Sequence, residues 1–375
     1  MSAPKITRLR VALVAAPLAN PIVAPFGTVR TRHNILVRVE TDDGAWGIGE
    51  SWGNFPPWGC RDRVDILVNV IRPLLVGQRL DDPSRLYWML ADRLRALANQ
   101  LGAVGPFQQA LAGADIALWD AAARRAGKPL ADFVRGGPSR QSVDVYATNL
   151  PISRPETIEA MAAKGHARFK FRVSGDDLAI VERLRDARAA AGARPLMADA
   201  TQSFRLEMLR PLARRLAELS LEWLEEPFLA DYLEAYAKWR DEPVRPPVAL
   251  GENSYRLDGF RRILDIVHPD VAQPDITKTA GLSEGRDICR AIIAAGPRAC
   301  LHMYGGPIGL YASAHLTAAI DGMSWLEMDS MPNPLFEMLL PEAPVVREGK
   351  LLLPEGPGLG DDLLREEVFE NFEIR

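Results

Sequence analysis

The segments RPLMADA (194–200), LEWLEEP (221–227) and PPVALGEN (246–253) decide the fold, because each is a short apolar run that carries acidic residues near its end. Five more runs have strand character: VDVYATN (143–149), ARFKFRV (167–173), DVAQPDI (270–276), RACLHMY (298–304) and MSWLEMD (323–329). Helical periodicity separates most of these runs, as in SEGRDICRAIIAAG (283–296). Eight strands that alternate with helices predict an α/β fold, a (β/α)8 barrel of parallel strands.

The pattern is different before residue 136. Residues 1–135 show strand-type runs joined by the turn Asp42-Asp43-Gly44, and then three helical patterns. They predict an α+β capping domain, and the barrel is predicted over 136–345. The Pro/Gly-rich segment 346–375 lies outside the alternation and is expected to return to the capping domain.

Composition excludes several classes of protein. The 375 residues are 47% hydrophobic and 25% charged, which is typical of globular proteins and not of disordered or collagen-like chains. There is no long apolar run and no convincing signal peptide, so a cytoplasmic protein without a membrane partner is predicted. The net charge of -4 weighs against a nucleic-acid partner. Three cysteines without CxxC spacing make neither a disulfide framework nor a zinc site.

Ionisable residues recur at the ends of the predicted barrel strands. They are Lys170, Arg172, Asp199, Glu225, Glu252, Asp275, His302 and Glu327. From one strand to the next they follow at intervals of 23 to 29 residues, close to the length of one unit in a barrel of about 250 residues. They are expected to meet at the C-terminal face, where barrels of this type carry their active sites.

Asp199, Glu225 and Glu252 end three consecutive strands. Converging carboxylates repel each other unless a cation lies between them, and hard oxygen ligands favour Mg²⁺. The pattern therefore predicts a magnesium site. The alternative is that each acid caps a helix or pairs with an arginine.

His302 and Asp275 end neighbouring strands at the same depth. A carboxylate beside an imidazole fixes its tautomer and raises its basicity, which is a general-base arrangement. Glu327 could donate a proton or a hydrogen bond to a substrate oxygen if its pKa is raised. The remaining histidines are interpreted as structural: His33, His166, His268 and His315.

Lys170 and Arg172 lie two residues apart, so on a strand both side chains point the same way, into the barrel. Two cations there need anionic partners, either a bound carboxylate or the acidic cluster. The alternative is a pair of structural salt bridges.

Together these residues resemble the enolase superfamily, and within it the mandelate racemase / muconate lactonizing enzyme group. The similarity covers essentially the whole chain. The motifs that carry it are GIGES (47–51), ADIALWDAAARRAGKPL (114–130), FKFR (169–172), MADAT (197–201), LEEPF (224–228), LGEN (250–253), QPD (273–275), LHMYGG (301–306), LEMD (326–329) and PEGPGLG (354–360).

The resemblance implies one Mg²⁺ per subunit, bound by Asp199, Glu225 and Glu252, which chelates a substrate carboxylate while a base removes the α-proton. Asp275 with His302 resembles the mandelate racemase subgroup. Lys278 is expected to point inward near the substrate. A small hydroxy-acid substrate and a homo-oligomer are also implied.

Two positions depart from the family pattern. Arg172 replaces the family's second lysine and, with a pKa normally of 12.5–13.8, is a poor base that would instead grip substrate oxygens. Thr201 stands where the family often has asparagine. With one good base, dehydration of an acid sugar to a 2-keto-3-deoxy acid fits best. The alternatives are a racemase, epimerase or lactone cycloisomerase, and a non-catalytic ligand-binding barrel.

Specificity is expected from capping-domain loops over 17–32 and 51–61, because loops on a rigid scaffold carry such contacts. Trp52, Phe55 and Trp58 would form an apolar lid, or alternatively pack between the domains. Arg30 or Arg32 could meet a distal anionic group of the substrate.

Overall fold

The computed structural model describes residues 3–24, 27–54, 56–175, 179–361, 363–365 and 367–374. Eight parallel strands pair in chain order, and the last pairs with the first, so the barrel is closed. The strands are β4 (Ser142–Pro151), β5 (Phe169–Arg172), β6 (Leu196–Asp199), β7 (Leu224–Glu225), β8 (Val248–Leu250), β9 (Val271–Ala272), β10 (Arg298–Leu301) and β11 (Met323–Asp329). The predicted barrel is confirmed.

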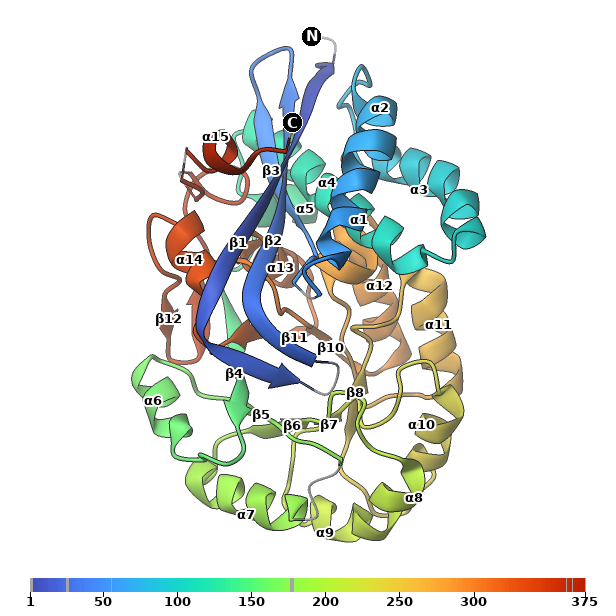
Figure 1. Cartoon of the computed structure of the whole chain (residues 1–375), viewed down its shortest axis with the longest axis vertical. Helices are drawn as coiled ribbons and strands as arrows, with labels where there is room; N and C mark the ends of the chain where they lie inside the picture. Colours follow the sequence, from blue (N-terminus) through green and yellow to red (C-terminus); the bar gives the residue numbers. More distant parts are fainter. Residues whose placement is uncertain are drawn as a thin grey trace.

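Helices cover the outside of the barrel (Figure 1). They are α6 (Thr157–Ala163), α7 (Ile180–Ala191), α8 (Leu206–Leu209), η2 (Arg210–Leu212), α9 (Ala213–Ala217), α10 (Leu233–Arg240), α11 (Arg256–Ile266), η3 (Ile276–Ala280), α12 (Gly281–Ala295), α13 (Pro307–Ala319) and α14 (Pro334–Leu339). Side chains alternate along β5, so that some face the surrounding helices and others face the barrel interior. Phe169 and Phe171 join the large core that includes residues of these helices, whereas Lys170 between them lies near Tyr146 of the barrel interior.

The capping domain begins with an antiparallel sheet of β1 (Ile6–Ala24), β2 (Gly27–Thr41) and β3 (Trp46–Ser51). Its helices follow: α1 (Gly59–Asp65), η1 (Ile66–Ile71), α2 (Arg72–Leu75), α3 (Pro83–Gln100), α4 (Val104–Arg125) and α5 (Leu130–Arg135). In α3, apolar residues on one face are buried and charged residues are exposed, as its periodicity predicts. None of the helices described is long and apolar enough to cross a membrane.

The prediction of a loop over 17–32 was wrong. Within the described residues, β1 continues to Ala24 and β2 starts at Gly27, so most of this stretch is a β-ribbon that Figure 1 shows leaning toward the barrel strands. The register shifts between Pro17 and Ile22. A proline cannot donate to a ladder, and a bulge in a two-stranded ribbon accommodates it.

The segment after the barrel touches both parts of the molecule. The strand β13 (Lys350–Leu352) pairs with the start of β4 and with β12 (Val346–Arg347), and Glu373, just after α15 (Val368–Phe372), forms a bridge to Ala12 of β1. Both ends of the chain therefore lie at the capping sheet (Figure 1). The division into 1–135, 136–345 and 346–375 stays a prediction.

Buried carboxylates of the capping domain hold the starts of barrel helices. Asp115 of α4 accepts hydrogen bonds from the backbone N–H and the hydroxyl of Ser283, both at 2.7 Å, in the first turn of α12. Such N–H groups have no partner within the helix, and the helix dipole favours an acceptor there. Burial nevertheless dominates and raises the pKa of Asp115 to about 7.

We therefore expect the advantage of the wild type over Asp115→Asn, measured as the free energy of unfolding, to shrink as pH rises from 5 to 8. A carboxyl whose pKa rises on folding contributes its stability below the unfolded value, near 3.9, and loses it as pH rises through about 7. Urea unfolding of both proteins at four pH values measures this. An advantage that does not change over this pH range would mean that the carboxylate is ionised throughout, and would contradict the raised pKa.

Candidate active site

A cavity of about 440 Å³ opens at the carboxyl ends of the barrel strands, under the capping domain. From the barrel it is lined by Asn149, Arg172, Asp199, Thr201, Gln202, Glu252, Asn253, Lys278, His302, Tyr304 and Glu327. From the capping domain it is lined by Ile22, Val29, Trp52, Asn54, Pro56 and Trp58. Most of the predicted site residues thus meet in one cavity that both domains enclose.

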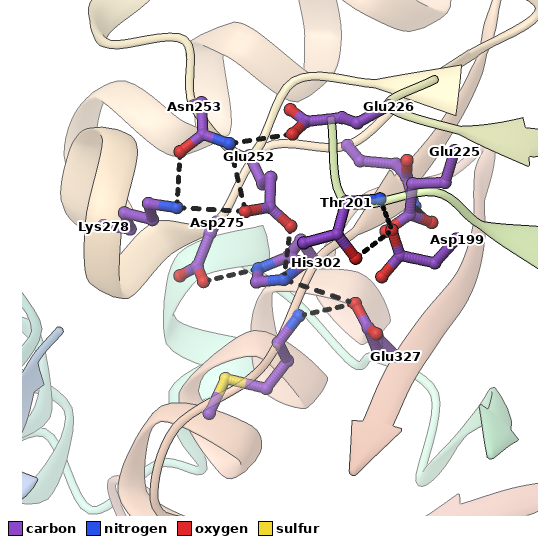
Figure 2. A network of polar contacts seen from close by, with 12 residues as sticks. Asp199, Thr201, Glu225, Glu226, Glu252, Asn253, Asp275, Lys278, His302 and Glu327 are labelled. Carbon is purple, nitrogen blue, oxygen red and sulfur yellow. Dashed lines mark hydrogen bonds and ion pairs between the residues drawn. The ribbon is translucent and has the colours of Figure 1, made fainter. Parts of the chain in front are cut away.

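His302 follows β10 and lies between three carboxylates (Figure 2). Its Nδ1 is 2.8 Å from Asp275 Oδ2, and its Nε2 is 2.8 Å from Glu252 Oε2 and 3.7 Å from Glu327 Oε2. Burial opposes a charge on the imidazole. The charges of Glu252 and Glu327 and the hydrogen bonds to Asp275 and Glu252 outweigh it and raise the pKa of His302 well above its usual value.

Asp275 is itself held in place. It caps η3, where its Oδ1 accepts from the backbone N–H and the hydroxyl of Thr277, both at 2.7 Å. Its Oδ2 therefore remains for the imidazole, so His302 is oriented through Nδ1, and its Nε2 points to the side of the cavity where Glu252 and Glu327 lie. This is the geometry of a general base.

Lys170 is completely buried and does not reach the cavity. Its Nζ lies 2.5 Å from Glu225 Oε1 and 2.8 Å from Glu327 Oε1. Burial lowers the pKa of Lys170, but the charges of Glu225, Glu327 and Asp199 outweigh it and raise the pKa above its usual value. Lys170 is therefore a charged partner of two strand-end glutamates of the acidic cluster.

Arg172 lies one pleat further along β5 and does line the cavity. It donates to Asn149 Oδ1, and its buried Nε has no partner among the described residues. Asn149 in turn donates to Asp329 Oδ1 at 3.3 Å. The guanidinium also hydrogen-bonds Tyr304. It has no carboxylate partner in the described part of the chain, and its Nε can still meet an anionic or hydroxyl oxygen of a ligand.

Two of the three carboxylates predicted to bind metal, Asp199 and Glu225, end the neighbouring strands β6 and β7 and pair in their register, and Glu252 follows the end of β8. Each already has protein partners. The Thr201 backbone N–H donates to Asp199 at 2.8 Å, Gln273 donates to Glu225 at 2.7 Å, and Lys278 donates to Glu252 at 3.1 Å. Among the described residues, no three or more His, Cys, Asp or Glu side chains are gathered as a metal site.

The donor set nevertheless suits a hard divalent cation. Burial raises the pKa of Glu225 to about 7 and, although Lys170 opposes this, the charges of Asp199 and Glu327 add to it. The adjacent Glu226 is buried, and its Oε1 has no hydrogen-bond partner within the described ranges. Crowded carboxylate oxygens with an unpartnered acceptor beside them are what an oxygen-binding cation would neutralise.

The remaining predicted contacts lie at different depths. Thr201 and Lys278 line the cavity, the latter with its Nζ 2.8 Å from Asn253 Oδ1. Trp52 and Trp58 also line it, although Trp58 is 73% exposed. Arg30 is exposed and is not among the lining residues described, and Phe55 lies outside the described residues.

Arg32 lies beneath the cavity instead of on the surface. It is fully buried, forms an ion pair with Asp329 and stacks on the ring of Tyr304, with its guanidinium carbon 4.2 Å from the ring centre. Its position on a strand that the sequence suggested was a loop explains why it packs inward.

Sequence reasoning missed several lining residues. Asn149 lies close to the carboxyl end of the first barrel strand, as the ionisable residues do on the others, so the same rule applied to polar residues would have found it. Asn253 directly follows Glu252, and its amide donates to Glu226 at 2.8 Å. Gln202 and Tyr304 carry no comparable signal, because each lies in a loop after its strand.

Two family profiles match this chain: the mandelate racemase / muconate lactonizing enzyme N-terminal domain over residues 6–134, and the enolase C-terminal domain-like family over 154–368. Among curated relatives, the arabinonate dehydratase of Saccharolobus solfataricus is 28% identical over 91% of both chains. The D-galactarolactone cycloisomerase of Agrobacterium fabrum is 30% identical over 98% of both.

Solved structures of the same family are similar to this chain over nearly its whole length. A mandelate racemase/muconate lactonizing enzyme from Bordetella bronchiseptica is 38% identical, with a TM-score of 0.87 over 96% of this chain and 97% of that one. A racemase from Streptomyces coelicolor with bound magnesium is 25% identical, with a TM-score of 0.87 over 98% of this chain and 100% of that one. The chain therefore belongs to the mandelate racemase / muconate lactonizing enzyme family of the enolase superfamily.

Proposed function

We propose that this enzyme removes the proton next to the carboxylate of a hydroxy acid, and that it dehydrates an acid sugar to a 2-keto-3-deoxy acid. The observation that carries the proposal is one oriented base at the cavity, His302 on Asp275, together with an arginine where a second base would be needed. The similarity to an arabinonate dehydratase supports dehydration.

Asp199, Glu225 and Glu252 would hold one Mg²⁺ per subunit, as the oxygen-rich donor set and the magnesium-bound relative suggest. When bound, such a cation would neutralise the charge that builds up on a carboxylate as its neighbouring carbon loses a proton.

The chain's own groups then divide the work. His302 Nε2 takes the α-proton while Asp275 holds Nδ1, so the imidazolium that forms is stabilised. The same imidazolium returns the proton to the β-hydroxyl as the carbon–oxygen bond breaks. Water leaves, and the resulting enol tautomerises to the ketone, so the reaction is a net loss of water without an oxidant.

Arg172 would grip a hydroxyl or carboxylate oxygen on the opposite side. Replacing it with lysine restores a group that can act as a base. Burial beside another cation can lower the pKa of a lysine by about 3 units, so that part of it is neutral. We expect Arg172→Lys to exchange the α-proton of the substrate's C2 epimer, which presents that proton to the side of Arg172, with solvent deuterium. NMR of the epimer recovered from D₂O measures this. No exchange by Arg172→Lys, or equal exchange by the wild type, would contradict the role assigned to Arg172.

One screen tests the function itself. The Mg²⁺-loaded protein is incubated with a library of mono- and diacid sugars, and 2-keto-3-deoxy products are read as semicarbazones, with EDTA-treated protein as control. A hit that EDTA abolishes supports the proposal. Proton exchange without loss of water, or turnover of lactones only, favours a racemase, epimerase or cycloisomerase, which the 30% identity to a lactone cycloisomerase keeps as second candidate. Tight binding without turnover would indicate a ligand-binding barrel.

A further inference from the structure

The last turn before α13 is held by a carboxylate from the other domain. Glu50 of β3 is 1% exposed; its Oε1 accepts from the Gly306 N–H at 2.6 Å and its Oε2 from the Gly309 N–H at 2.8 Å. Asn34 of β2 also donates to it. Since α13 begins at Pro307, Glu50 receives N–H groups that the helix itself leaves without partners.

These N–H groups are close to the imidazole along the chain. The segment from His302 to Gly306 is here termed the His302 turn. Its first backbone N–H, that of His302, donates to the Pro274 carbonyl at 3.1 Å. The Met303 N–H donates to Glu327 at 3.3 Å, and the Asn333 amide donates to the Gly305 carbonyl at 3.0 Å. Two side chains of the capping domain also contact this turn: Arg32 stacks on the Tyr304 ring, and Glu50 accepts from the Gly306 backbone N–H.

The contact depends on small residues. A Cβ at Gly306 would lie 2.3 Å from Asn34 Nδ2, and one at Gly305 would lie 2.5 Å from Glu50 Oε1. A Cβ at Gly309 would meet Thr277 Cγ2 at 2.7 Å. The glycines therefore let Glu50 and Asn34 approach the backbone this closely.

The same end of β3 also contacts the support of Asp275, the carboxylate that pairs with His302. The backbone N–H of Trp52 donates to the Thr277 carbonyl at 3.0 Å, and the N–H and hydroxyl of Thr277 donate to Asp275. Glu50 and Trp52 are two residues apart, so one short stretch of the capping domain contacts the supports of both His302 and Asp275.

We propose that Glu50 is a positioning residue, which holds the His302 turn so that the imidazole stays against Asp275 when the capping domain is docked. Glu50 lies outside the described lining of the cavity and touches no substrate. The inference rests on the proposed function only in naming this imidazole as the base; the placement of His302 is a property of the folded protein.

The test is Glu50→Gln, which keeps the shape but replaces one acceptor oxygen with an amino group facing an N–H. Hydrogen exchange over 301–310 should become roughly 10- to 100-fold faster, as the cost of leaving a buried N–H without its acceptor predicts. In protein labelled with ¹⁵N-histidine, the His302 Nδ1–H resonance should shift or broaden. The chain has five histidines, so His302→Asn assigns this signal.

Asp115→Asn is the matched control, because Asp115 is equally buried, comes from the capping domain and holds the start of another barrel helix, α12. It should speed exchange around Ser283 and leave the His302 resonance in place. If Glu50→Gln does not fold, Glu50→Asp, which keeps the charge but shortens the reach, is measured in the same way.

Faster exchange at the start of α13 with an unchanged His302 signal would overturn the proposal, since Glu50 would then only join the domains. An unchanged exchange rate would overturn it as well. Neither measurement needs a substrate, so a failed substrate screen and a failed positioning role are told apart.

Discussion

His302→Asn should lower the rate of α-proton removal by about 10²–10⁴-fold, the usual contribution of a general base. Asparagine can still form a hydrogen bond near Asp275, but it cannot take up a proton at the cavity. The rate is measured as deuterium incorporation at the α-carbon of whichever acid the screen identifies. Loss of water should slow in parallel, because the same imidazole is proposed to protonate the leaving hydroxyl.

His268→Asn is the matched control. His268 is exposed and has a left-handed backbone conformation, with φ near 49°, which asparagine tolerates well. It should leave the rate unchanged. Full dehydration activity in folded His302→Asn would require another base, and would move attention to the opposite side of the cavity, where Arg172 lies.

Lys170→Met should lower the free energy of unfolding by about 3–5 kcal/mol, the range for removing one partner of a buried ion pair. Lys170 Nζ contacts Glu225 and Glu327 at 2.5 and 2.8 Å, and all three side chains are buried. Without the ammonium, both carboxylates remain in a barrel interior that has little water to solvate them. Urea unfolding in EDTA measures the loss without a contribution from bound metal.

An exposed lysine provides the comparison. Lys350 contacts Asp144 at 3.0 Å, with side chains 49% and 28% exposed. Lys350→Met should lower the free energy of unfolding by at most about 1 kcal/mol, the range for an exposed ion pair. An equal loss of unfolding free energy at the two positions would mean that the buried Lys170 pair stabilises the protein no more than an exposed pair. Adding Glu225→Gln to Lys170→Met should recover part of the loss, because one uncompensated charge is removed.

Periodicity predicted the barrel because each βα unit repeats locally, and each strand ends with a polar residue at one rim. Strand lengths were less predictable. LEWLEEP contains only two residues of regular strand, Leu224–Glu225, since pairing needs a neighbour and cannot be read from one segment. The ribbon over 17–32 was missed because proline and glycine suggested a loop, whereas pairing between β1 and β2 stabilises it as two strands.

The site shows the same contrast between what a local pattern predicts and what contacts between distant segments decide. Alternation along β5 correctly places Lys170 and Arg172 on one side, yet it does not tell that one is fully buried and the other lines the cavity. Which carboxylate pairs with which cation depends on distances between strands that the sequence does not contain. Glu50 lies in a recognisable motif, but its contact with Gly306 joins residues 256 positions apart and follows only from the docked domains.

The pairings that complete the molecule join segments made at very different times during synthesis. Asn149 and Asp329, at the two strands that close the barrel, are 180 residues apart, and Arg10 contacts Glu373 across 363 residues. Contacts of such high order form late and slowly. On the ribosome, β4 would wait with an open edge until β11 emerges, so the nascent chain should need protection from aggregation over most of its translation.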